Sequence, residues 1–139
     1  MRPRVYITQP VSASAVARLR AVAEVTMNPD MLHIATKDEL IAAARSHDIL
    51  FCLLHDRIDR DVISANPKLK AIASTTITPA DIDTAEATKR GITPIVGLEA
   101  YVVPDHRFRG KEKRNHLTLL AESTEGYYNL IRLCSAGYL

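Results

Sequence analysis

A run of hydroxyl-bearing residues is the part of this chain best suited to bind a small ligand. Ser74-Thr75-Thr76-Ile77-Thr78 follows an apolar segment and precedes Pro79, a residue favoured at the first position of a helix. Hydroxyl and backbone N–H groups at the start of a helix bind anions, so Thr76, Ile77 and Thr78 form a candidate anion site. The alternative is that Thr78 only caps the helix that follows.

Three carboxylates crowd the segment after the third apolar run. Asp56, Asp59 and Asp61 carry the oxygen ligands that Mg²⁺ prefers. Arg57 and Arg60 alternate with them, which favours a solvated cluster of ion pairs. The sequence therefore predicts ion pairs here and no metal ion.

The other residues that could support catalysis or metal binding are isolated. Cys52 and Cys134 lie in apolar stretches without metal-ligand spacing, so we expect two buried free thiols in a reducing compartment. The one basic run, R-F-R-G-K-E-K-R at 107–114, fits a surface loop better than a phosphate-binding surface. Four histidines have no Ser, Cys or carboxylate at catalytic spacing: His33, His47, His55 and His106.

Apolar runs alternate with helical patterns along the chain, as in a parallel α/β sheet. Short strand-like runs occur at 5–8, 24–27, 49–54, 71–74, 92–96 and 117–121, with helical patterns between them. The alternation predicts a single α/β domain with a flavodoxin-like (Rossmann-like) doubly wound sheet of about six parallel strands and helices on both faces. We expect the strand order 2-1-3-4-5-6 and a core that contains Val5, Ile7, Leu50, Cys52, Ile72, Ile95, Leu117 and Leu119.

The last helical pattern, at 124–139, carries an apolar stripe. We expect this helix to pack on the sheet as part of the core. The stripe comprises Tyr127, Leu130, Ile131, Leu133, Cys134 and Tyr138.

Composition sets the outer limits. A chain of 139 residues with 47% hydrophobic and 24% charged residues is typical of one globular domain. A net charge of +2 is too small to imply a nucleic-acid partner. No apolar run is long enough to span a membrane and no signal segment follows Met1, so we expect a cytoplasmic protein that needs no partner. The composition leaves self-association as a homodimer open.

The early part of the chain carries five short motifs that can be compared with known families. They are R-V-Y-I-T at 4–8, L-L-H-D-R-I-D at 53–59, P-K-L-K-A-I-A at 67–73, D-I-D at 81–83 and R-G-I at 90–92. Residues 1–90 thereby resemble the substrate-binding (catalytic) domain of D-isomer-specific 2-hydroxyacid dehydrogenases of the glyoxylate and hydroxypyruvate reductase type. The resemblance implies that Thr76, Ile77 and Thr78 hold a substrate carboxylate, although the glycines usual in that loop are absent. It also implies that NAD and the catalytic Arg, Glu and His belong to a second domain.

A second set of motifs occupies the later part of the chain. P-I-V-G-L-E-A-Y-V at 94–102, H-L-T-L-L-A at 116–121 and E-G-Y-Y-N-L-I-R-L-C-S at 125–135 resemble the PHP domain of the bacterial DNA polymerase III alpha subunit. The resemblance implies that Glu99 and His116 match two ligands of a multinuclear metal cluster. The other ligands of that cluster have no counterpart here, so we expect both to be ordinary exposed residues. The two parts share one helix–strand unit at 85–96.

These observations favour a chimeric scaffold, engineered or recombined, over an enzyme. The five glycines form no G-x-G-x-x-G turn, so we expect no bound dinucleotide, no cofactor and no catalytic activity. A sequence that stops at Tyr138-Leu139, within a polymerase motif, favours a designed boundary. The alternatives are a remnant substrate-binding domain that weakly binds a small carboxylate, and a weak metal or nucleic-acid binder.

Overall fold

The chain folds as two units in the computed structural model, Met1–Thr93 and Pro94–Leu139, called the N-terminal and C-terminal units below. The structure describes residues 1–75, 81–93, 95–103 and 115–138. The sequence led us to expect one domain. Two units form instead because the last two strands pair with each other and not with the main sheet.

Four short parallel strands form the sheet of the N-terminal unit. They are β1 (Arg4–Ile7), β2 (Glu24–Met27), β3 (Ile49–Cys52) and β4 (Ala71–Ser74), in the order β2-β1-β3-β4. This confirms the first four positions of the predicted order. Each strand is an apolar or β-branched run, and successive strands are joined by helices, as parallel pairing requires.

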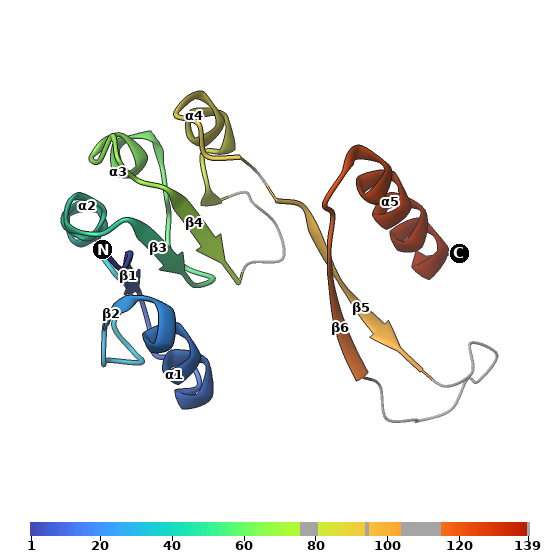
Figure 1. Ribbon diagram of the computed structural model, residues 1–139, viewed down its shortest axis with the longest axis horizontal. Coiled ribbons are helices and arrows are strands. Elements are labelled where there is room, and N and C mark those ends of the chain that lie inside the picture. Colours follow the sequence, from blue (N-terminus) through green and yellow to red (C-terminus); the bar gives the residue numbers. More distant parts are fainter. Residues whose placement is uncertain (76–80, 94, 104–114, 139) are drawn as a thin grey trace. The chain divides into compact units, whose positions relative to one another are not determined.

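Helices cover both faces of this sheet (Figure 1). α1 (Ala13–Val22) packs in one apolar cluster, whose buried members are Val5, Ile7, Val16 and Ala23. On the opposite face lie α2 (Lys37–Ser46), α3 (Arg60–Ser64) and α4 (Thr84–Lys89), with a larger cluster that includes Leu40, Leu50, Cys52, Val62 and Ile63. The predicted core residues Val5, Ile7, Leu50 and Cys52 are therefore confirmed, and Ile72 is partly buried beside them.

Local sequence signals fix where the helices begin and end. Thr36 and Glu39 form a capping box at the start of α2. α4 begins at Thr84 with Asp83 as its cap, later than the start at Pro79 that the sequence suggested; residues 76–80 lie outside the described residues. Gly91 follows α4 with φ of 82°, the left-handed conformation that glycine adopts without strain.

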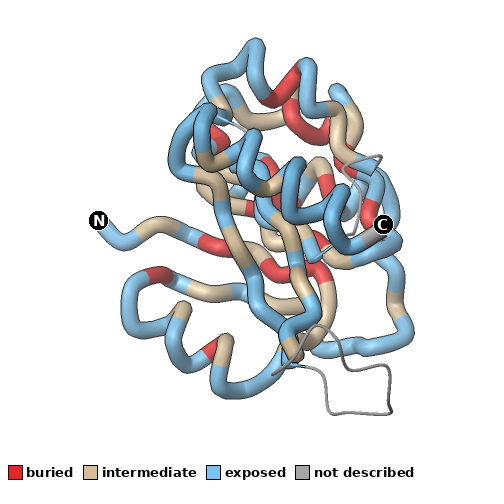
Figure 2. Tube along the Cα trace, turned by 90° about the vertical axis from the view of Figure 1, so that its right-hand side faces the viewer, coloured by how far each residue is buried: buried red, intermediate tan, exposed pale blue. Residues whose placement is uncertain are grey.

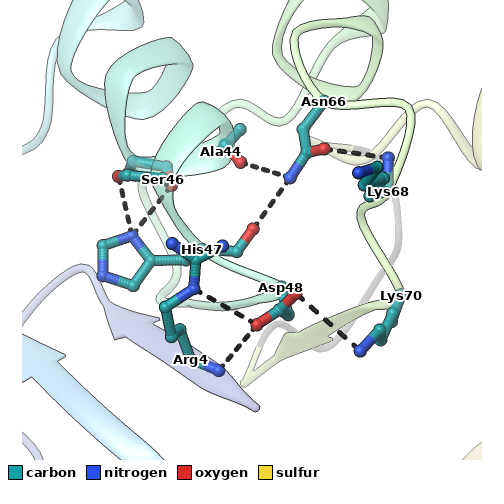
Figure 3. A network of polar contacts seen from close by, with 9 residues as sticks. Arg4, Ala44, Ser46, His47, Asp48, Asn66, Lys68 and Lys70 are labelled. Carbon is teal, nitrogen blue, oxygen red and sulfur yellow. Dashed lines mark hydrogen bonds and ion pairs between the residues drawn. The ribbon is translucent and has the colours of Figure 1, made fainter. Parts of the chain in front are cut away.

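A polar network ties the amino ends of the strands together (Figure 3). The Asp48 carboxylate accepts a hydrogen bond from the Arg4 backbone N–H at 2.8 Å and lies 3.8 Å from Lys70 Nζ. The Asn66 side-chain amide donates to the carbonyl oxygens of Ala44 at 2.8 Å and His47 at 2.9 Å. These contacts join β1, α2, β3 and the segment before β4.

The C-terminal unit does not extend the parallel sheet. β5 (Gly97–Val102) and β6 (Asn115–Leu120) pair antiparallel as a separate two-stranded sheet, so the prediction of a single six-stranded sheet is wrong. Pro94 has no N–H to donate to a ladder, which disfavours the strand that was expected at 92–96 beside β4. The core positions predicted here are also wrong, since Ile95 and Leu117 are exposed and Leu119 is only partly buried.

The last helix, α5 (Thr124–Tyr138), has no fully buried residue along 124–137. Gly126 and Leu130 are partly buried, whereas Tyr127, Ile131 and Leu133 are exposed. The expectation that this helix belongs to the main core is wrong: the buried residues of the described chain all lie in the N-terminal unit (Figure 2). None of the described helices is both long and apolar enough to cross a membrane.

The capping box of α2 makes stability depend on pH. The Thr36 backbone N–H, followed by the His33 ring and the Thr36 hydroxyl, lowers the pKa of Glu39 from 4.5 to about 2. A lowered pKa in the folded state means that the stabilisation is complete above pH 4.5 and disappears as the pH falls through about 2. We expect the stability advantage of the wild type over Glu39→Gln to shrink across this range, because Gln keeps a capping hydrogen bond but does not titrate.

Urea unfolding of both proteins at a series of pH values measures this advantage. A difference in unfolding free energy that stays constant from pH 4.5 to 2 would contradict the assignment.

Candidate ligand site at the carboxyl edge of the sheet

A buried carboxylate joins the carboxyl ends of β1 and β3. Asp56 is only 2% exposed, and Thr8, the residue after β1, is completely buried. Asp56 Oδ2 accepts hydrogen bonds from the Thr8 hydroxyl and, at 2.7 Å, from the Leu53 backbone N–H. Because a buried charge needs hydrogen-bond donors, these two contacts are what makes the position tolerable.

The same contacts close a tight turn after β3. Asp56 donates its backbone N–H to the Leu53 carbonyl at 3.1 Å, while its side chain returns to the Leu53 N–H. Leu54 and His55, at the tip of this turn, are exposed. The turn therefore exposes the apolar side chain of Leu54 and the polar side chain of His55, while the Asp56–Leu53 hydrogen bonds hold its two ends together.

Sequence reasoning did not identify Thr8 and Asp56 as a pair. They are 48 residues apart, and Asp56 was assigned to a solvated cluster. The signal that could have found it is the position of a carboxylate directly after an apolar strand. Asp56 Oδ1 is buried and has no hydrogen-bond partner among the residues that the structure describes, which is unusual for a carboxylate oxygen.

The predicted anion site follows the neighbouring strand. The ladder between β3 and β4 extends to Thr75, which donates its N–H to the Cys52 carbonyl at 3.3 Å. The carboxyl end of β4 thus lies next to the carboxyl end of β3 and the turn that follows β3. Thr76, Ile77 and Thr78, predicted to bind substrate, lie outside the described residues.

The other two carboxylates of the predicted cluster form ion pairs, as expected, but with a different partner. Lys37 Nζ lies 2.9 Å from Asp59 and 2.5 Å from Asp61, which links the start of α2 to the start of α3. Hydrogen bonding to Lys37 lowers the pKa of Asp59. Arg60, which was expected to pair here, instead contacts Glu86 at 3.6 Å.

Cys52 lies at the inner end of the site and is fully buried, as predicted, whereas Cys134 is exposed. Burial, and secondly the charge of Asp56, raises the pKa of the Cys52 thiol to about 12. A neutral, inaccessible thiol is a weak nucleophile. Cys52 therefore contributes packing to this site.

The C-terminal unit brings together the two residues that resemble metal ligands. His116 Nδ1 contacts Glu99 Oε1, and the ring of Tyr101 meets the His116 ring edge-on with centroids 4.5 Å apart. Both members of the pair are more than half exposed, as the sequence predicted. No third His, Cys, Asp or Glu joins them among the residues that the structure describes.

The fold and the site define a family. The family model for the catalytic domain of D-isomer specific 2-hydroxyacid dehydrogenases matches residues 5–97, so the chain belongs to this family. A glyoxylate reductase of Thermofilum pendens is 36% identical over 91 residues, which cover 66% of this chain and 27% of that protein. A crystal structure of a Pyrococcus horikoshii protein matches with a TM-score of 0.59 and 29% identity over 66% of this chain and 26% of its own.

A second match confirms the resemblance to the polymerase. The DNA polymerase III alpha subunit of Thermus aquaticus is 47% identical over 60 residues, which cover 39% of this chain and 5% of that protein. The chain therefore resembles two different enzymes in different parts.

The expectation that the chain is not an enzyme is contradicted by these matches, because the curated relatives include several glyoxylate reductases. That expectation rested on the missing G-x-G-x-x-G turn. The chain spans about a quarter of its dehydrogenase relatives, 27% of the Thermofilum protein, so a motif missing from it does not define the chemistry of a whole protein.

Removing either partner of the Thr8–Asp56 contact should destabilise the N-terminal unit. We expect Thr8→Val and Asp56→Ala each to lower the unfolding free energy by about 1–3 kcal/mol, because each leaves a buried polar group without its partner. The double variant should lose less than the sum, since the two residues share one interaction.

Urea unfolding of the wild type, the two single variants and the double variant gives the coupling free energy between Thr8 and Asp56. Thr26→Val, an exposed threonine on β2, is the matched control and should change stability by less than about 0.5 kcal/mol. Fully additive losses would contradict the contact.

The two thiols should differ in reactivity. In native protein at pH 8 we expect one thiol to react rapidly with a disulfide reagent, and both to react after denaturation, because Cys52 is buried with a raised pKa. Cys134→Ser should abolish the rapid phase. Two rapid thiols in the native wild type would show that Cys52 is accessible.

Proposed function

We propose that the N-terminal unit is the substrate-binding half of a 2-hydroxyacid dehydrogenase active site, and that it binds a small 2-oxo acid through its carboxylate. The observation that carries this proposal is the turn closed by Asp56. Its buried carboxylate holds both Leu53 and Thr8, so the tip of the turn is held at the carboxyl edge of the sheet, next to the end of β4. In open α/β sheets this edge is where ligands bind.

The carboxylate contact is assigned to Thr76, Ile77 and Thr78 on the basis of sequence. Two hydroxyl groups and consecutive backbone N–H groups offer the donors that a carboxylate needs. Glycine is absent from this run, so the hydroxyls take a larger share of the binding than in a glycine-rich loop. We therefore expect weak binding.

The turn after β3 would contact the rest of the ligand. Leu54 offers an apolar surface and His55 a donor, and both are exposed. A ligand of this class has a small apolar or hydroxymethyl group beside its oxo carbon, which suits such a pair. The substrate named for the curated relatives, glyoxylate, is the smallest member of the class.

In this proposal the unit binds and orients the substrate. Reduction of a 2-oxo acid also needs a hydride donor and an acid–base group next to the reacting carbon. Those groups would come from protein beyond the family match at residues 5–97.

Glyoxylate titrated into isotope-labelled protein tests this function. We expect millimolar, saturable chemical-shift changes at residues 53–56 and at Ser74 and Thr75, and none for glycolaldehyde, which lacks the carboxylate. The variant Thr76→Val with Thr78→Val should weaken binding several-fold, because each lost hydroxyl removes one hydrogen bond.

Thr26→Val is again the control and should bind like the wild type, since Thr26 lies on the far edge strand β2. Equal responses to glyoxylate and glycolaldehyde, or no response at the carboxyl edge of β3 and β4, would refute the proposal.

A further inference from the structure

The C-terminal unit lacks a buried core. None of its described residues is classed as buried, and its large exposed side chains are mostly apolar. Leu117 is 46% exposed and Leu120 is 67% exposed, both on β6. The other large apolar residues exposed on β5 and α5 are Tyr101, Val102, Tyr127, Tyr128, Ile131 and Leu133.

Strand β6 also has an unprotected edge. It pairs with β5 on one side, in six regular antiparallel pairs, and no other described strand pairs with it. Its sequence, N-H-L-T-L-L, contains no Pro, Lys or carboxylate, the residues that usually block edge pairing. The outer edge of β6 is therefore six residues long, has no bulge, and offers backbone N–H and C=O groups with which another strand could pair.

The other described sheet edges are less suited to pairing. β2 and β4 have four residues each, with charged side chains on or beside them, Glu24 on β2 and Lys70 next to β4. The outer edge of β5 also has six residues, but β5 carries the Glu99 carboxylate, which disfavours edge pairing. β6 is therefore the edge most open to pairing in the part of the chain that the structure describes.

We propose that two copies of this chain associate through antiparallel pairing of their β6 strands, which forms the four-stranded sheet β5-β6-β6-β5. A second copy fits because a two-fold axis relates an antiparallel pair of identical strands. The β6 edge of each copy then pairs with the β6 edge of the other, so no β6 edge remains for a third copy. No carboxylate or lysine on β6 opposes this pairing.

The alternation of side chains limits the possible registers. Directly opposed residues in an antiparallel pair share a face, so the axis must pass through a residue and not between two. With Thr118 on the axis, Leu117 of each copy lies opposite Leu119 of the other. These leucines share a face with Leu98 and Ala100, their partners on β5. The pairing therefore extends the partly buried apolar face across the axis.

The surface available suits a weak dimer. A stable interface buries on the order of 800 Å² per partner, about 20 residues a side. The six residues of β6, with the apolar side chains exposed beside them, are fewer than that. We accordingly expect a dimer that dissociates on dilution.

Sedimentation of the full chain over a concentration series tests this dimer. The wild type should change reversibly from monomer to dimer and no further. Thr118→Lys should weaken dimerisation roughly fivefold or more, because it places two like charges opposite each other at the axis. Thr118→Glu should do the same.

A mixture of the Thr118→Lys and Thr118→Glu variants should restore dimerisation, because opposite charges then face each other. This recovery separates a lost contact from a lost fold, and circular dichroism of each variant checks the fold independently. Thr26→Lys is the matched control, an exposed threonine on the edge strand β2, and should dimerise like the wild type.

Each of four results would overturn the proposal. The first is a monomer at every concentration. The second is open-ended association, which would mean that the edge does not close on a second copy. The third is a dimer that Thr26→Lys weakens and Thr118→Lys does not. The fourth is a mixture of folded Thr118→Lys and Thr118→Glu variants that does not recover dimerisation.

Discussion

Strand β3 must bury both of its faces, and the N-terminal unit is organised around this requirement. Leu50 and Cys52 point into the cluster under α2, α3 and α4, while Ile49 and Phe51 pack with the cluster under α1. A parallel strand in this position needs helices on both sides and parallel neighbours reached by crossovers. The burial that results also raises the pKa of Cys52.

Asp56 is buried at the carboxyl edge of the sheet, next to the core. A carboxylate is tolerated there only with donors, and the chain supplies the Leu53 N–H and the Thr8 hydroxyl. The contact serves stability and geometry together, since it joins the ends of β1 and β3 and fixes the turn between them and α3. In the proposed anion site, the strands and the Asp56 contact would hold the turn in place, and the residues that contact the ligand would lie on connecting segments. Binding residues are often found on such loops in α/β proteins.

Signals confined to neighbouring residues predicted the local structure well. The bounds of β2 and β4 agree with the apolar runs at 24–27 and 71–74. The alternation of strands and helices likewise predicted the order of the first four strands. Contacts between distant residues were harder to predict, because no periodicity links Thr8 to Asp56 or Lys37 to Asp61. The burial of Asp56 depends on where three strands end in space, which a sequence pattern does not encode.

The error in the C-terminal unit has a similar physical origin. Alternating apolar and polar residues predict a strand but not its partner, and β5 and β6 satisfy each other at the smallest loop-closure cost. A parallel pair of β5 and β6 would have required a crossover connection between these two strands, whereas antiparallel pairing needs only the connecting segment 103–114. This local solution leaves a two-stranded sheet, which is marginal unless something covers or extends it. The predicted strand at 117–121 and the predicted helix at 124–139 therefore agree closely with β6 and α5, whereas β5 forms at 97–102 in place of the strand expected at 92–96.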